Sequence, residues 1–189
     1  MSFFKNNSYE IVRLFVIRVG IMIFSMIVMM AAVSAVGGTL ATAAVSVFSV
    51  VFYLFIIYST MWHVGYKRGE RQISGRGDGD KWYGAKVALF ASLPNIFLCF
   101  LMAIGLLQFV FTDSFLGAFY AIARLLEGLL NAMYIGLIGL PDLESAPLDA
   151  ALTTALSILS VLPAIITSQI ACRFGEKNIR LTKDKPKLD

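Results

Sequence analysis

The sequence predicts an all-α fold, a polytopic integral membrane helix bundle with four to five transmembrane helices and room for an interfacial or re-entrant helix. Composition is the first reason: of 189 residues, 58% are hydrophobic and only 15% are charged, and the mean hydropathy is +0.78. Ordinary globular domains contain about a quarter charged residues. The second reason is that several apolar stretches reach the roughly 20 residues that cross a bilayer as a helix.

Five stretches are long enough to span the hydrocarbon core, and none shows the alternation of a membrane β-strand. We expect helices at residues 11–36, 40–62, 87–111, 115–140 and 148–172. The first run is longer than the apolar core of a signal peptide, so we expect this helix to be retained. Because the loops are short, residues 1–174 are expected to form a single transmembrane helical domain.

Two polar segments accompany these helices. Residues 64–86 are expected to form a cytoplasmic loop, and their glycines predict a flexible turn rather than a helix. Residues 175–189 are charged and contain proline, which predicts a basic and disordered cytoplasmic tail.

Charge predicts the orientation of the chain, because Lys and Arg in short loops remain on the cytoplasmic side. The amino-terminal segment up to Arg18, the 64–86 loop and the segment from Arg173 onward hold 15 of the 16 basic residues. We therefore expect a multi-pass protein of the cell membrane with both termini in the cytoplasm. Five crossings would put the termini on opposite sides, so one stretch is expected not to cross simply.

Residues 115–140 are the stretch that conflicts with five simple crossings. The surrounding segment 112–149 holds five acids and the single base Arg124, so both flanks are expected outside. Three arrangements stay open: a helix along the outer interface, two half-helices that dip in and return, or a crossing against the charge rule. The arrangements that do not cross are favoured.

The same stretch holds a polar stripe, since its polar side chains fall within about 60° of one line on a helix. The stripe consists of Tyr120, Arg124, Glu127, Asn131 and Tyr134. Arg124 and Glu127 are three residues apart and can pair. The stripe is interpreted either as a functional lining, since intramembrane ionisable residues mark pathways and relays, or as a polar face that meets water or fixes helix register.

Small residues form a second stripe beside the polar one, with the spacing that close helix contacts require. This candidate packing face consists of Ala121, Gly128, Ala132, Gly136 and Gly139. In residues 87–111, Pro94 followed by Asn95 predicts a kink, because proline lacks the N–H that would bond the Phe90 carbonyl.

A short motif occurs in the 64–86 loop. Gly75-Arg76-Gly77-Asp78 and Gly77-Asp78-Gly79-Asp80 resemble the G-x-G-D motif of intramembrane aspartyl proteases, and Gly-Asp-Lys before an apolar helix is similar to prepilin peptidases. The resemblance implies two aspartates that share a proton and activate water. It covers only this short run, and no Asp precedes Asp78, where prepilin peptidases place their first catalytic aspartate.

Metal and disulfide chemistry are not indicated, because both cysteines lie in apolar stretches and His63 is the only histidine. We expect no catalytic residue, no metal, no cofactor and no nucleic-acid partner. The expected partners are the lipid bilayer, with anionic headgroups at the basic loop, and either further copies of the chain in a homo-oligomer or a membrane partner subunit.

Three functions follow from these features. The first is a transport or channel component that acts in an oligomer or with a partner subunit, because a polar stripe lies beside a small-residue face. The second is a non-transporting membrane interaction, assembly or immunity factor. The third and most remote is a G-x-G-D-type intramembrane aspartyl peptidase. Because this is the only enzymatic function among the three, the protein is not expected to be an enzyme.

Overall fold

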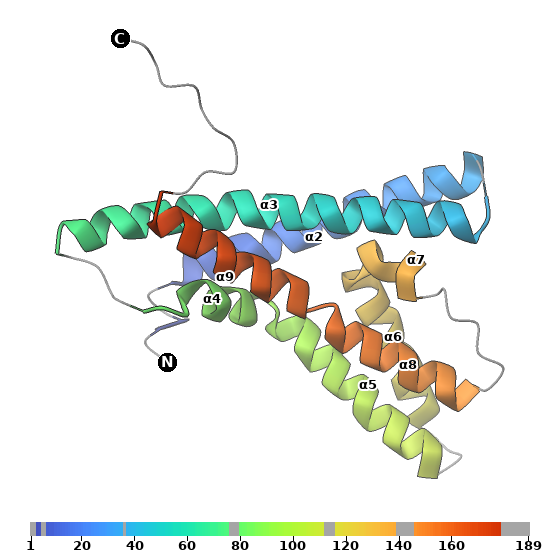
Figure 1. The fold of residues 1–189 in the computed structure, drawn as a ribbon. Helices are drawn as coiled ribbons and strands as arrows, with labels where there is room; N and C mark the ends of the chain where they lie inside the picture. Colours follow the sequence, from blue (N-terminus) through green and yellow to red (C-terminus); the bar gives the residue numbers. More distant parts are fainter. Residues whose placement is uncertain are drawn as a thin grey trace.

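The computed structural model describes residues 3–4, 7–35, 37–75, 80–111, 116–138 and 146–178. This part of the chain is almost entirely helical and contains no strand, which confirms the all-α fold (Figure 1). Within it, three helices are long and apolar enough to cross a membrane, and two bent helix pairs raise the number to five. The elements are α2 (Ser8–Ala35), α3 (Thr39–Ile73), α4 (Tyr83–Ala91), α5 (Leu93–Phe111), α6 (Leu116–Leu130), η1 (Ala132–Tyr134), α7 (Ile135–Ile138), α8 (Ala146–Leu159) and α9 (Leu162–Glu176).

A long antiparallel hairpin of α2 and α3 forms one side of the bundle (Figure 1). Gly37 and Gly38 in its connection have φ values of 67° and 85°, which glycine adopts without the steric penalty of a Cβ atom. The buried face of α2 follows helical spacing and consists of Ile11, Leu14, Arg18, Ile21 and Ser25. Arg18, which the charge pattern assigned to the cytoplasmic segment, therefore lies inside the bundle.

Glycines bring the backbones of α3 and α9 into direct contact. A Cβ atom added at Gly65 would lie 2.1 Å from the Cys172 carbonyl oxygen, and Gly69, one turn later, also faces α9. The interpretation of residues 64–86 as a flexible turn is wrong over much of its length. α3 continues as a helix to Ile73 and α4 begins at Tyr83, because the glycines of α3 serve close packing rather than a turn.

Two spans are bent by more than 40° near the middle of the bundle, and a third, Asp149–Glu176, contains a turn without such a bend. α4 and α5 meet at Ser92 with a bend of 58°, two residues before Pro94, where the sequence predicts a kink. α6 meets η1 at Asn131 with a bend of 85°. α8 gives way to α9 in the turn at residues 160–161, and Pro163, which lacks an N–H, lies in the first turn of α9.

Residues 115–140 contain two half-helices rather than one continuous helix. α6 packs along α5, and after the bend α7 approaches the first turns of α3, where the Gly136 N–H donates to Ser46 Oγ at 2.9 Å. Those turns lie at the end of the molecule that holds the α2–α3 connection, whereas α3 and α9 end, and α4 begins, at the opposite end (Figure 1). The 85° bend between the half-helices is the geometry of a broken span or of a re-entrant segment, so both arrangements stay open.

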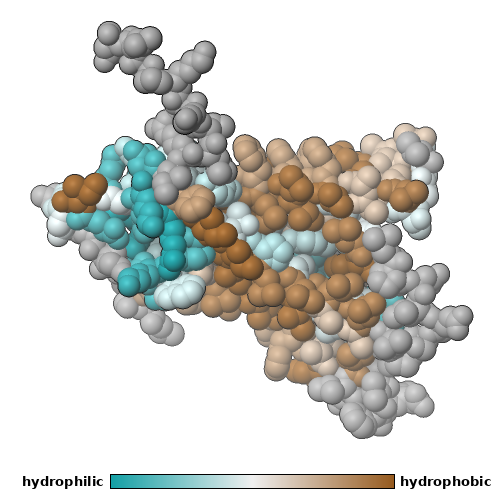
Figure 2. Space-filling view, viewed as in Figure 1, coloured by the Kyte–Doolittle hydropathy of each residue, from teal (hydrophilic) through white to brown (hydrophobic). Residues whose placement is uncertain are grey.

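The surface of the bundle suits a bilayer. Apolar side chains cover most of the visible face, and polar side chains gather at the end where α3 and α9 end and α4 begins (Figure 2). Large apolar residues are exposed along the spans, for example Phe55 at 66% and Ile27 at 62%. Contact with lipid hydrocarbon explains such an apolar exterior, which a soluble monomer rarely presents.

The contact between α3 and α9 predicts a large difference between two glycine substitutions. Gly65→Ala would force the backbones apart, and overpacking of this kind costs about 1–3 kcal/mol. Gly20→Ala is the matched control, because a Cβ atom at Gly20 meets nothing within 4 Å. Thermal unfolding in mild detergent should show a lower midpoint for Gly65→Ala and an equal or higher one for Gly20→Ala. Equal midpoints for both variants would contradict the packing described here.

Candidate functional site

Four buried polar side chains meet where the broken helices approach one another. Arg18 of α2, Asn95 of α5, Glu127 of α6 and Asn131, between α6 and η1, are each at most 3% exposed. We call these four residues the polar cluster. Arg18 lies about three turns into α2, about 15 Å along the axis from its first residue.

Asn131 joins the other three members of the polar cluster. Its side-chain oxygen accepts a hydrogen bond from Arg18 Nη2, while its side-chain nitrogen donates to Glu127 Oε1 and, at 3.2 Å, to Asn95 Oδ1. The amide thus presents its oxygen to the cation and its NH₂ group to the carboxylate. No ion pair directly links Arg18 to Glu127, both of which are described, so Asn131 mediates between the two charges.

Further polar groups surround the polar cluster. Tyr53 of α3 and Tyr134 of η1 lie within electrostatic range of the Arg18 guanidinium. Ser157 of α8 lies beside the Glu127 carboxyl group. Side chains from α2, α3, α5, α6, η1 and α8 therefore line one polar interior, and all the broken spans contribute to it.

Several polar atoms in this interior have no hydrogen-bond partner within the described chain. They are Arg18 Nε, Asn95 Nδ2 and the hydroxyl group of Tyr134. A buried polar group without a partner costs about 1–3 kcal/mol, so these atoms would gain most from a small polar species. The donors beside Arg18 suit an anion, and the Glu127 carboxyl group suits a proton or a cation.

The predicted polar stripe divides within α6, between Arg124 and Glu127. Its members in the polar interior are Glu127, Asn131 and Tyr134. Arg124 points elsewhere: its side chain is 46% exposed, and its Nη2 lies 3.4 Å from Asp149 Oδ2. The predicted pairing of Arg124 with Glu127 is therefore replaced by a surface pair with α8. Tyr120 also contacts α8, because its hydroxyl donates to the Ala150 carbonyl at 3.4 Å.

The candidate packing face divides at the bend. Ala132 and Gly136 are buried, and a Cβ atom at Gly136 would lie 2.3 Å from a backbone oxygen of α3. Ala121 is exposed, and a Cβ atom at Gly128 would meet nothing within 4 Å, so these two residues do not pack against the bundle as predicted. Gly139 lies outside the described residues. The bend at Asn131 separates the two halves of a face that is continuous only on a straight helix.

Sequence reasoning missed Arg18 as a site residue and named Asn95 only as part of a kink. The signal for Arg18 was present, because it stands at a spacing of three or four residues from Leu14 and Ile21 on one apolar face. Counting Arg18 with the basic amino-terminal segment concealed that spacing.

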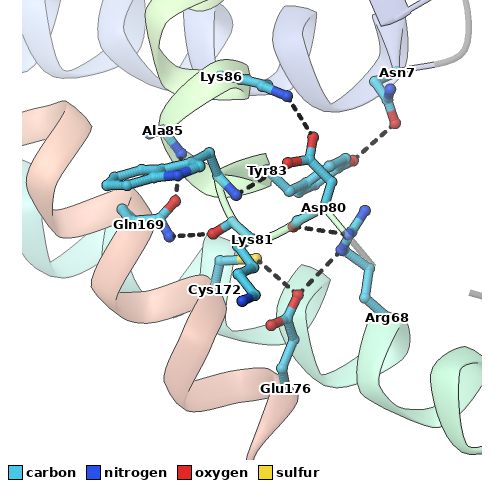
Figure 3. Close-up of polar contacts among 11 residues, drawn as sticks. Asn7, Arg68, Asp80, Lys81, Tyr83, Ala85, Lys86, Gln169, Cys172 and Glu176 are labelled. Carbon is cyan, nitrogen blue, oxygen red and sulfur yellow. Dashed lines mark hydrogen bonds and ion pairs between the residues drawn. The ribbon is translucent and has the colours of Figure 1, made fainter. Parts of the chain in front are cut away.

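A second group of polar contacts ties the polar end of the molecule together (Figure 3). We call Arg68, Asp80, Lys86, Gln169 and Glu176 the end cluster. Arg68 Nε lies 3.3 Å from Glu176 Oε1, which links α3 to α9. The Gln169 side chain accepts from the Ala85 N–H at 2.9 Å and donates to the Lys81 carbonyl at 2.7 Å, which fastens the start of α4 to α9 (Figure 3).

One aspartate of the G-x-G-D motif, Asp80, belongs to this end cluster. Asp80 accepts from Lys86 Nζ at 2.8 Å and from the Trp82 N–H at 3.0 Å, and Asp78 lies outside the described residues. Within the described chain no group of three or more His, Cys, Asp or Glu side chains could hold a metal ion.

Comparison of the chain with known protein families, with curated proteins and with solved structures finds no significant match.

The end cluster predicts a pH dependence. The hydrogen bond from Lys86 holds the pKa of Asp80 below its ordinary value, with help from the Trp82 N–H and Arg68, although partial burial opposes the shift. Because the folded-state pKa is lowered, the stabilisation is present above the ordinary Asp pKa and is lost as pH falls through the lowered value. Asp80→Asn should therefore remove the part of the acid-induced loss of folding stability that comes from protonation of Asp80.

The measurement is the thermal unfolding midpoint between pH 6 and pH 3. Asp80→Asn should lose less stability over this range than the unsubstituted protein, by at most about 1 kcal/mol because the pair is partly exposed. Glu70→Gln, which changes an exposed acid on α3, is the control and should follow the unsubstituted protein. A parallel decline for all three proteins would contradict the assignment.

Proposed function

We propose that this protein is a transport or channel component of a membrane, acting in an oligomer or with a partner subunit, and that the polar cluster is its functional centre. The observation that supports this most is the Arg18–Asn131–Glu127 connection buried inside the apolar bundle. Ionisable groups in a membrane interior are costly and are concentrated on ion pathways, proton relays and ligand sites.

The broken helices also support the proposal. Non-helical backbone at membrane depth is tolerated where protein or a polar cavity surrounds it, and discontinuous helices form the binding sites of many secondary transporters. Here the bends at Ser92 and Asn131 come within a few residues of Asn95 and Glu127. Packing alone would be achieved by straight apolar helices without these breaks.

The size of the transported species is limited by the contacts inside the polar cluster. Its side chains bond directly to one another, with 3.2 Å between Asn131 Nδ2 and Asn95 Oδ1. A bulky solute would have to displace them, whereas a proton or a small ion needs only a change of hydrogen-bond partner. We therefore favour a proton or a small inorganic ion as the species that moves.

The test is flux into proteoliposomes that contain the purified full-length chain. Proton entry is followed with a trapped pH-sensitive dye, and ion entry with dyes for small monovalent ions. Glu127→Gln keeps the shape of the side chain but removes its charge, and Asn131→Leu removes the connection to Arg18. Each should reduce flux at least about tenfold, which corresponds to about 1.4 kcal/mol.

Arg124→Gln is the matched control, because it alters an intramembrane-segment charge that faces away from the polar cluster. Its flux should equal that of the unsubstituted protein. Flux no greater than that of empty vesicles, or equal flux for Glu127→Gln and the unsubstituted protein, would overturn the proposal. In that case retention of a partner chain during purification would favour the interaction or assembly function.

A further inference from the structure

An apolar groove opens on the outside of the bundle. Its volume is about 390 Å³, and every lining residue is apolar. The lining includes Leu89 of α4, Ile96 and Phe100 of α5, Ile158 of α8, and Leu162 and Ile165 of α9. The groove thus lies beside the α4–α5 bend and the turn between α8 and α9.

A basic rim stands at the polar end of the same two helices. We use this name for Lys81, Trp82, Arg173 and Lys177, all of which are exposed. The Arg173 guanidinium lies over the Trp82 ring at 5.6 Å, and Trp82 itself is 61% exposed. Among the described residues no acidic side chain forms an ion pair with Lys81 or Arg173.

The groove and the basic rim occupy one continuous face. On α9, Leu162 and Arg173 are eleven residues apart, which places them within about 20° of each other and about 16 Å apart along the axis. The exposed residues Ile166 and Ile170 lie between them on that face. On the α4 side, Trp82 and Leu89 are seven residues apart, so they are also within about 20°.

The end cluster makes this face rigid. Gln169 bonds the Lys81 carbonyl and the Ala85 N–H, so the start of α4, which holds part of the basic rim, is fixed to α9 (Figure 3). An elongated ligand could therefore meet the cations and the groove without a change in the fold.

We propose that this face binds one anionic phospholipid, with its phosphate at Lys81 and Arg173 and an acyl chain along Ile170 and Ile166 into the groove. Charge complementarity selects the headgroup, since each Lys or Arg near a membrane surface contributes about fivefold to the binding of anionic lipid. The groove selects a chain rather than a flat helix because it is recessed between α4–α5 and α8–α9. The proposal is independent of transport by the polar cluster.

The test is native mass spectrometry of the full-length chain in mild detergent with equal amounts of phosphatidylglycerol and phosphatidylcholine that have identical acyl chains. The unsubstituted protein should retain phosphatidylglycerol preferentially. Lys81→Gln with Arg173→Gln should lower this retention by about 25-fold. Leu162→Trp, which fills the groove, should lower retention of phosphatidylglycerol while the rim charges remain.

Two matched controls separate this site from general positive charge and from unfolding. Arg13→Gln with Lys67→Gln removes two exposed bases from α2 and α3 and should leave retention unchanged. Lys81→Arg with Arg173→Lys keeps both charges and should retain the lipid. Equal loss in the Arg13 and Lys67 double variant, or equal retention of both lipids by the unsubstituted protein, would overturn the proposal. So would a dimer that Leu162→Trp dissociates, because a second copy would then occupy the groove.

Discussion

The structure depends on how the charge of Arg18 is accommodated inside an apolar bundle. An isolated guanidinium in hydrocarbon is too costly to persist, and removal of one partner from a buried ion pair commonly costs about 3–5 kcal/mol. Arg18 is 3% exposed and reaches Asn131, whose NH₂ group meets Glu127. One amide thus satisfies a cation and an anion on different helices, and the relative positions of α2 and α6 follow from that requirement.

The helix breaks are a consequence of the same requirement. A straight helix through residues 116–138 would carry Asn131 past the interior, whereas the 85° bend places it between α6 and η1, where it can reach α2 and α5 together. The glycine contacts of α3 and α9 provide the opposite kind of interface, in which backbones touch and no polar side chain is needed. The bundle therefore combines one tightly packed seam with one polar interior.

The sequence could predict much of this fold but less of the candidate site. Apolar length predicted the helices, and charge indicated that three basic segments lie together. Residues from all three segments, Asn7, Arg68, Tyr83 and Glu176, do meet at one end. Glu127 and Asn131 were identifiable because polar residues on one helical line are informative even when the helix later bends. Their partners Arg18 and Asn95 were not identifiable, because the spacing of residues within one segment does not show which residue of another helix approaches that segment.

Two sequence-based predictions, on the glycines of residues 64–86 and on Arg18, were wrong because each residue type is compatible with two different structures. Glycine favours both turns and close helix contacts, so Gly65 and Gly69 could be interpreted either way until α9 was placed against them. A basic residue near the amino end of an apolar helix can extend to the membrane surface or be buried with a partner. Arg18 is buried because Asn131, between α6 and η1, accepts a hydrogen bond from it.

The central claim is that Arg18 and Glu127 compensate each other through Asn131. A double-mutant cycle tests it most directly, with unfolding free energies measured reversibly in mixed detergent for the unsubstituted protein, Arg18→Met, Glu127→Leu and the double variant. Each single substitution should cost about 3–5 kcal/mol by leaving one buried charge uncompensated. The double substitution should cost less than the two together by at least about 1 kcal/mol, whereas additivity within about 0.5 kcal/mol would contradict the account.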